Sequence, residues 1–573
     1  MTVSSIFLNS GQSPATPAKQ FPMSFGGCHP KAGSPGGLRD VLMRGRQFLA
    51  CSVVFSAMST LGFAKSPDAR PNVLIIITDD EQNDFVGCTG GKVKTPNIDS
   101  IASEGIRFAN GNVPHSVCSP SRYAILTGRY YDNNFGPERM AQYPRGTASC
   151  IDNDIYLEKD GLNLPSILQK NGYATGLVGK FHLTGHEDFK NSKTWAASGL
   201  QAYPENAKAS DPEVSAKMKA NHEIWRKKIA PFGFDYVNGV YAANLRELYL
   251  DEANAHNVEW TADAAIRFID EQATTDRPFF LYVATTYPHG PAPEGLKDGK
   301  YIHSLDADVR ATGEGWVTDR DLTRFTPSRE SYKAAAATGR ERTAAWWDGA
   351  VGAIIQELKK TGAYENTIIV YQSDHGGPRN GKTTLYETGV QVPSLMQWPA
   401  KEVEGVVYPH VTSSVDITPT ILDCAGVQVP QTMHMDGVSL KPVLLGSSKP
   451  VQEAIFLQLG YACAVKTDTM KYIAVRYPKE IEEKISRGEN FKGFGKETLK
   501  QPYLMLHAEL CSWAASSNPH YFERDQLYDL VHDPEEKVNL FTQKPEAAKK
   551  MQALLAQEIK KHIPHRPFGE FNP

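Results

Sequence analysis

The stretch "RPNVLIIITDD" at residues 70–80 carries the strongest fold signal in the chain. Its apolar run from Val73 to Ile77 is uninterrupted, whereas a strand with one face in water alternates apolar and polar residues. Continuous runs of this kind are typical of strands that are buried on both faces in parallel sheets. The segment therefore predicts a central strand, and two carboxylates, Asp79 and Asp80, follow its end directly.

Helical patterns alternate with further apolar strands along the next 300 or so residues. The clearest examples are "LPSILQKNGYATGLVGKFHL" at 164–183, "TADAAIRFIDEQ" followed by "RPFFLYVATTYPH" at 261–289, and a long helix with "TIIVYQS" at 341–373. A helical stretch is also expected at "NIDSIASEGIRF", residues 97–108. This alternation predicts an α/β fold whose large, mainly parallel (mixed) central sheet is flanked by helices.

The character of the sequence changes after residue 450. Shorter strands with alternating character occur at 454–459, 461–476 and 525–533, and a final helix is expected at 545–562. We therefore predict a smaller C-terminal α+β subdomain with an antiparallel sheet over 451–573, after a main domain over 65–450.

The first 64 residues are predicted to be a disordered leader and a signal peptide. Residues 1–42 are rich in Gly, Pro and Ser without periodicity, which indicates disorder or a start codon placed too early. The probable export signal begins at Met43, where two arginines precede an apolar run over 48–63. That run is short for a bilayer span, so we expect no stable membrane anchor. The mature chain is expected to begin near Lys65 and to be periplasmic or secreted.

Composition and cysteine usage narrow the class of protein. The 573 residues carry a formal net charge of only −4, which does not favour nucleic-acid binding. Six cysteines follow the leader, at positions 88, 118, 150, 424, 463 and 511, and none has CxxC spacing. Neither a zinc ribbon nor a disulfide scaffold is indicated. Cys118 precedes Ser119 and Pro120, which suit the first positions of a helix that Gly128 can end.

Three long polar stretches show little periodicity and are expected to be surface loops around a cleft. They cover 186–230, 290–335 and 478–520. Aromatic residues in or near them are candidates for stacking on sugar rings, although buried aromatic residues are commoner: Tyr203, Trp225, Tyr287, Trp316 and Trp513.

Polar side chains follow the ends of four separate predicted strands. They are Asp79 and Asp80, Lys180 and His182, His289, and Asp374 with His375. Because the carboxyl ends of parallel strands share one edge of a sheet, where ligands bind, these groups are expected to meet there. Any one of them alone can be an ordinary loop residue, but four coincidences favour a site.

The residue types in this set divide into two chemical groups. The carboxylates of Asp79, Asp80 and Asp374 are hard oxygen donors that suit calcium or magnesium, whereas the imidazole of His375 suits zinc or manganese better. Positive charge and proton donors come from Arg122, Lys180, His182, His289 and Lys382. A cation with several basic groups beside a helix N-terminus is suited to a tetrahedral oxyanion, so the expected substrate is a sulfate or phosphate ester.

The segment "CSPSRYAILTGR" at 118–129 resembles the signature of the type I sulfatases of the alkaline-phosphatase-like superfamily, C-x-P-S-R followed by L-T-G-R. "GYATGLVGKFHL", "FFLYVATTYPH", "SDHG" and "GKTTLYETGVQVPSLMQWP" extend the resemblance over most of 71–450. It implies that Cys118 is oxidised to formylglycine by a formylglycine-generating enzyme. One hydroxyl of the hydrated aldehyde then attacks sulfur, and the other expels sulfate by re-forming the aldehyde.

The resemblance also implies a role for each site residue. Asp79, Asp80, Asp374 and His375 would bind one divalent cation, with calcium expected, although His375 replaces an asparagine that is common at this position. Arg122 and Lys180 would steady the diol, and His182 would assist the release of sulfate. His289 and Lys382 would contact the sulfate, and one of them would protonate the leaving oxygen.

Two other functions stay open. A formylglycine-dependent phosphodiesterase or phosphonate monoester hydrolase would use an overlapping site, and a non-catalytic sulfatase-like protein would bind a glycan without hydrolysing it. An ordinary cysteine hydrolase is not favoured, because no motif pairs Cys118 with a histidine and its orienting partner. For a sulfatase with long polar insertions we expect a sulfated carbohydrate or polysaccharide as substrate, with the sugar and the sulfate position undetermined.

Overall fold

A computed structural model describes residues 70–566, with gaps at 151–154, 185–194, 205, 246–249, 291–293, 298–299, 325–326, 336–338 and 378–379. The predicted leader over 1–64, with its export signal, lies outside the described residues. Among the helices that the structure describes, none is long and apolar enough to cross a membrane.

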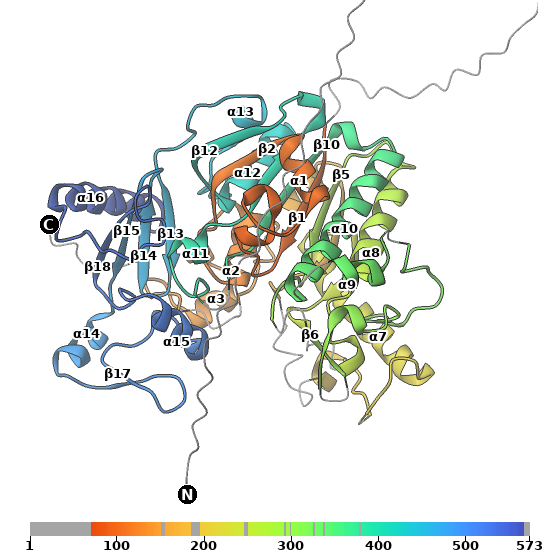
Figure 1. The fold of residues 1–573 in the computed structure, drawn as a ribbon, viewed down its shortest axis with the longest axis horizontal. Helices are drawn as coiled ribbons and strands as arrows, with labels where there is room; N and C mark the ends of the chain where they lie inside the picture. Colours follow the sequence, from red (N-terminus) through yellow and green to blue (C-terminus); the bar gives the residue numbers. More distant parts are fainter. Residues whose placement is uncertain are drawn as a thin grey trace, which may run out of the picture. The chain divides into compact units, whose positions relative to one another are not determined.

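An eight-stranded mixed sheet forms the main part of the fold, in the order β12-β2-β11-β10-β1-β5-β3-β4 (Figure 1). The predicted central strand is β1, which pairs in parallel with both β10 and β5. β3 continues the parallel set beside β5, and β11 is antiparallel to its neighbours. The strand bounds are β1 Asn72–Thr78, β2 Ile106–Asn112, β3 Ala174–Lys180, β4 Tyr236–Tyr241, β5 Phe279–Ala284, β10 Thr367–Ser373, β11 Ser394–Gln397 and β12 Val406–Ser413.

Helices cover both faces of this sheet, as the uninterrupted apolar run in β1 predicts. Val73, Ile75 and Ile77 belong to one buried cluster, and Leu74 and Ile76 belong to another on the opposite face. The second face carries α1 Pro96–Ser103, α8 Val258–Gln272 and α10 Gly339–Lys360, and the first carries α2 Cys118–Thr127, α4 Leu164–Lys170 and α12 Ile417–Cys424. Two hydrophobic layers therefore enclose the sheet, and only its edges and strand ends are open for chemistry.

A four-stranded antiparallel sheet follows in the C-terminal part, as predicted. Its order is β13-β14-β15-β18, with bounds Ile455–Leu459, Ala462–Lys466, Met470–Val475 and Asp525–Asp529. The final helix, α16 Pro545–His562, packs on it through Met551 and Leu555. The fold class is thereby confirmed, whereas the domain boundaries at residues 64 and 450 stay predictions.

Two local expectations were wrong. The helix expected over 97–108 ends at Ser103, and Ile106 already begins β2. The polar stretches expected as loops contain regular elements. The first contains α7 Pro212–Ile229, and the second contains the hairpins β6 Glu294–Lys297 with β7 Lys300–His303 and β8 Ala311–Thr312 with β9 Gly315–Trp316. The third contains α14 Lys479–Ser486, the hairpin β16 Phe491–Lys492 with β17 Thr498–Leu499, and α15 Ala508–Ser517. The buried side of α7 includes Asn221 and His222 beside apolar residues. The spacing of the apolar residues by themselves therefore does not show the helical period. The remaining short helices are α3 Pro137–Gln142, α9 Arg329–Ala335, α11 Glu387–Val390 and α13 Lys441–Leu444.

Candidate active site

The predicted site residues meet at the carboxyl ends of β10, β1, β5 and β3, which are neighbours in the sheet. Asp79 and Asp80 follow β1, and Asp374 and His375 follow β10. Lys180 is the last residue of β3. The strand register that pairs Thr78 with Ser373 places the two acidic turns side by side.

Cys118 is the first residue of α2 and is 1% exposed. The helix therefore begins one residue before the expected Ser119, and Gly128 ends it in the left-handed conformation as expected. The Cys118 Sγ lies 3.2 Å from both the Nε2 of His375 and the Nζ of Lys382. Burial favours the neutral thiol, but Lys180, Lys382 and His375 outweigh it and hold the pKa of Cys118 well below its usual value.

The negative charge of Asp79 is only partly balanced by the cationic side chains around it. Its Oδ2 accepts a hydrogen bond from the Lys180 Nζ at 2.5 Å, but its buried Oδ1 has no hydrogen-bond partner among the described residues. Burial and the neighbouring Asp374 carboxylate raise the pKa of Asp79 to about 7. A bound cation would satisfy both the orphaned oxygen and the excess negative charge.

Asp80 is the opposite case, because cationic groups surround it. Its Oδ1 lies 3.0 Å from both the His375 Nε2 and the Lys382 Nζ, and its Oδ2 lies 3.9 Å from the His289 Nε2. Although burial opposes ionisation, Lys382, His289 and His375 hold the pKa of Asp80 far below its usual value. Its φ of 66° is in the left-handed region, which is a strained conformation for a residue with a side chain.

The orientation of His375 suits a metal ligand. Its Nδ1 lies 2.8 Å from the carbonyl oxygen of Gly376, a contact in which the nitrogen has to carry the proton. The Nε2 then faces Asp80, Asp374 and Cys118, at 3.0, 3.6 and 3.2 Å respectively. A hydrogen bond of this kind, from one ring nitrogen to a carbonyl oxygen, fixes the tautomer of histidines that bind a metal through the other nitrogen.

The predicted metal ligands and the observed cluster differ in one member. Asp79, Asp80 and His375 offer ligand atoms that lie, together with the Cys118 Sγ, within 4.8 Å of one another. The Oδ2 of Asp374 instead accepts from the Nε of Arg122 at 2.9 Å. The Oδ1 of Asp374 accepts the backbone N–H of Asp80 at 3.2 Å and lies next to His375. The donor set of carboxylates and one imidazole fits a divalent cation.

The remaining predicted residues are all brought to this edge. Arg122 is fully buried, bonds Asp374, and donates to the carbonyl of Lys180 at 3.2 Å. Lys382 and His182 are also buried, and His182 has a left-handed φ of 57°. His289 is the most accessible member, with 22% of its side chain exposed and its Nδ1 on the Gly290 carbonyl at 2.8 Å.

Two supporting residues were not anticipated. Asn244, just after β4, accepts a hydrogen bond from the Lys180 Nζ at 3.1 Å through its Oδ1. The sequence "VNGVYAAN" could have indicated it, because Asn244 follows the end of a strand, as the other site residues do. Ser116 bonds both the carbonyl and the N–H of Thr384, and it thereby joins the segment before Cys118 to the one that carries Lys382.

Of the five aromatic candidates for sugar stacking, Trp225 and Tyr287 lie in the hydrophobic core. Trp513 is 38% exposed.

The family model described as Sulfatase matches residues 71–427. The chain belongs to the sulfatase family. A second family model, described as N-sulphoglucosamine sulphohydrolase, C-terminal, matches residues 379–477. This sulfatase is accordingly a sulfuric ester hydrolase, and the resemblance drawn from its motifs is confirmed.

Curated relatives and solved structures agree with this assignment. The sulfatase is 27% identical to human arylsulfatase A over 82% of its own chain and 83% of the relative. It is 25% identical to the N-acetylglucosamine-6-O-sulfatase of Bacteroides thetaiotaomicron, over 86% of each chain. A solved structure in complex with its substrate D-glucosamine-2-N,6-O-disulfate shares the fold, with a TM-score of 0.55, 20% identity, and coverage of 88% of this chain and 100% of that one.

Proposed function

We propose that this sulfatase removes sulfate groups from a sulfated carbohydrate, outside the cytoplasm, with a formylglycine made from Cys118 and one divalent cation. The observation that carries the proposal is the position of Cys118. Its side chain is buried at a helix N-terminus and lies within 3.2 Å of both His375 and Lys382. A formylglycine at this position, matured by a formylglycine-generating enzyme, would supply a hydrated aldehyde whose hydroxyls attack sulfur and later release sulfate.

The charges around position 118 suit a sulfate monoester. Lys180 and Lys382 provide positive charge beside the nucleophile, where negative charge develops on the sulfuryl oxygens in the transition state. Both lysines are buried, so water screens them little. Asp79, Asp80, Asp374 and His375 would hold the cation, whose Lewis acidity would polarise the sulfate. Calcium is the proposed ion, because most of the donor atoms are carboxylate oxygens.

His289 is the proposed proton donor to the leaving sugar oxygen. It is partly exposed whereas Cys118, Lys180 and Lys382 are buried, so among these four residues it is the one that a sugar arriving from solvent would reach first. Its Nδ1 is engaged by the Gly290 carbonyl, which leaves the Nε2 directed into the site. A proton on that nitrogen is placed to reach a leaving oxygen.

The carbohydrate class of the substrate is supported by the relatives. The Bacteroides relative is an N-acetylglucosamine-6-O-sulfatase, and a structural neighbour binds a disulfated glucosamine. The alternatives are hydrolysis of phosphodiesters or phosphonate monoesters and non-catalytic binding of a glycan.

The first test is the mass of the tryptic peptide Phe108–Arg122 from protein made in its native host. A formylglycine at position 118 is the expected result, followed by sulfate release from 6-O-sulfated N-acetylglucosamine and no turnover of phosphodiester controls. An intact thiol at position 118 would remove the proposed nucleophile. Faster turnover of the phosphodiester would instead favour the alternative hydrolase.

A further inference from the structure

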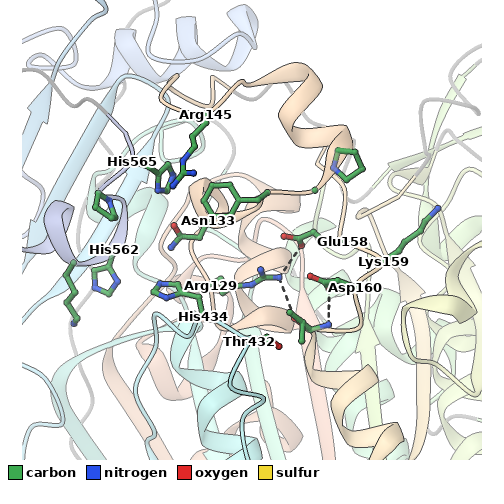
Figure 2. A pocket seen from close by; sticks show the side chains of 16 residues that line it. Arg129, Asn133, Arg145, Glu158, Lys159, Asp160, Thr432, His434, His562 and His565 are labelled. Carbon is green, nitrogen blue, oxygen red and sulfur yellow. Dashed lines mark hydrogen bonds and ion pairs between the residues drawn. The ribbon is translucent and has the colours of Figure 1, made fainter.

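A second cavity lies at the far end of the helix that carries Cys118 (Figure 2). It has a volume of about 760 Å³ and is lined by the residues around Arg129, by α3, by the segment at Thr432–His434 and by the end of α16. Cys118 begins α2 and Arg129 follows its last turn, so about 15 Å of helix separate the two sites. None of the residues assigned to the active site lines this cavity.

Positive charge predominates in the lining of the cavity. The cationic side chains are Arg129, Arg145, Lys159 and Lys561, and the carboxylates are Glu158 and Asp160. The two sets leave a surplus of positive charge in a concave surface, which favours an anion.

Arg129 is the buried anchor of the cavity. It is 6% exposed, its guanidinium pairs with Glu158 at 3.2 Å, and its Nε has no hydrogen-bond partner among the described residues. Figure 2 shows Arg129 between Glu158 and His434. A buried N–H without an acceptor is costly, and an oxygen of a bound ligand would satisfy it.

Two histidines beside Arg129 are held by one carboxylate. The Oδ1 of Asp436 lies 2.8 Å from both the Nε2 of His434 and the Nδ1 of His562. Its Oδ2 accepts from the N–H of Tyr130 and from the Asn133 side chain. These contacts of Asp436 hold the wall of the cavity in place. The Nε2 of His562 also lies 3.0 Å from the Oε2 of Glu558, so both of its ring nitrogens are engaged. Of the two imidazoles, His434, whose side chain is 54% exposed, is the one placed to bond a ligand.

An aromatic ring lies on the rim next to these charges. Phe135 is 48% exposed, and the Arg145 guanidinium carbon lies 5.4 Å from the centre of its ring. The His565 ring lies 5.0 Å from the same centre. An exposed ring can cover the apolar face of a sugar, while a neighbouring guanidinium bonds a sulfate or carboxylate on it.

We propose that this cavity is a second saccharide site, which binds one anionic sugar residue, sulfated or carboxylated, separately from the catalytic cluster. Arg129 and Arg145 bind the anionic group, Phe135 packs against the ring, and His434 and Asn133 bond its hydroxyls. The ligand class follows from the lining of the cavity, so the proposal does not depend on which sulfate ester the active site hydrolyses.

The test is calorimetric titration of the full chain with a heparin tetrasaccharide, on a Cys118→Ala background that keeps the probe intact. A binding event at the cavity is expected, whether or not the catalytic site also binds this saccharide. The double variant Arg145→Gln/Lys561→Gln removes two exposed cations and leaves the core untouched. It should weaken the event at the cavity by about tenfold or more and leave any event at the catalytic site unchanged. In the Cys118 background, this double variant should hydrolyse a small aryl sulfate at the normal rate.

A charge-matched control distinguishes binding in the cavity from non-specific attraction of the negatively charged saccharide to the protein surface. Lys227→Gln/Lys479→Gln removes the same charge from side chains that are 77% and 87% exposed elsewhere, and every binding event should stay within twofold of the unsubstituted chain. Equal losses in the two double variants, or the absence of any event that Arg145→Gln/Lys561→Gln weakens, would overturn the proposal. So would displacement of the tetrasaccharide from the cavity by equimolar potassium sulfate, since that result indicates an inorganic anion site.

Discussion

The side chain at position 118 is the point on which the proposed chemistry depends. Replacing Cys118 by alanine removes the group to be oxidised and leaves Lys180, Lys382 and the carboxylates in place. We expect sulfate release to fall to the background rate, with an unchanged circular dichroism spectrum. Cys88→Ala is the matched control, because that thiol is only half-buried and lies outside the site. Turnover by Cys118→Ala comparable to that of the control would rule out the mechanism.

The buried Oδ1 of Asp79, which has no hydrogen-bond partner among the described residues, predicts that the site needs a cation. Dialysis against a chelator should abolish sulfate release and lower the thermal midpoint, because the repulsion between the Asp79 and Asp374 carboxylates is then offset by Lys180 and Arg122 alone among the described residues that bond them. Restoring calcium, magnesium or manganese separately, with metal content measured each time, identifies the ion. Full activity in protein shown to contain no metal would contradict the assignment of these ligands.

At the scale of single elements, a bulge at Gly179 directs the end of β3. Gly179 has a φ of 89°, and the pairing of β3 with β4 shifts between Val178 and Lys180. A Cβ at Gly179 would lie 1.9 Å from the carbonyl oxygen of Ala284.

Gly179→Ala should therefore destabilise the fold by about 1–3 kcal/mol or more and reduce sulfate release by moving Lys180. Chemical denaturation and an activity assay measure the two effects. Gly362→Ala is the control, since Gly362 is also left-handed, with a φ of 71°, but has open space around it. It should cost stability without lowering the activity of the folded protein, and equal losses of activity in both variants would refute this role of Gly179.

A buried charge network joins the segment of Lys382 to the second sheet. The Lys471 Nζ of β15 lies 2.7 Å from the Glu387 carboxylate and 2.8 Å from that of Glu536, and it donates to the Leu385 carbonyl at 2.9 Å. Lys466 of β14 lies 2.7 Å from the other oxygen of Glu387. Glu387 is five residues after Lys382, so this network holds the active-site segment in place.

Lys471→Met should destabilise the protein by about 3–5 kcal/mol, because it leaves Glu387 and Glu536 buried without their shared cation. Residual folded enzyme should show a lower kcat through misplacement of Lys382. Lys466 still pairs with Glu387 in this variant, so Glu536 is the carboxylate left without a cation. The double variant Lys471→Met/Glu536→Gln removes that charge and should recover part of the stability in a double-mutant cycle. Additive losses in that cycle would show that the pair is not coupled.

These elements also show what could be predicted from sequence. The strand-end rule located Asp79, His375 and Lys180 because it needs only local apolar runs and the geometry common to parallel sheets. The sequence did not indicate Glu387, because its partner Lys471 lies 84 residues further on. Only the packing of the second sheet brings the two side chains together. The helix α7 was missed because polar side chains occupy part of its buried face.

At the scale of the whole molecule, α16 is joined to the segment after α2 through His562 and Asp436. Burial lowers the pKa of His562, but the hydrogen bonds to Asp436 and Glu558 outweigh it and raise that pKa above 6.5. Burial likewise raises the pKa of Asp436, but His434 and His562 outweigh it and hold that pKa at about 2, below 3.8. The stability that His562 contributes is complete below pH 6.5 and is lost as the pH rises through its higher folded-state pKa. The contribution of Asp436 is complete above pH 3.8 and is lost as the pH falls through about 2.

The thermal midpoint should therefore decrease as the pH rises above about 6.5. This decrease should be smaller in His562→Gln, which keeps a hydrogen-bond donor but does not titrate. His532→Gln is the control, because the His532 side chain is 81% exposed and water screens its contact with Asp529, so the substitution should change the profile less than His562→Gln does. A wild-type profile that is flat over this range would show that the pair does not contribute.

The burial of Cys118 also sets an order of events in biosynthesis. At 1% exposure the side chain is out of reach of another enzyme once α2 has packed. On the proposed mechanism, oxidation has to precede folding, so each molecule is committed to activity or inactivity while it is still being made. A purified batch is then a fixed mixture of the two forms, and later exposure of the folded protein to the modifying enzyme will not raise the modified fraction.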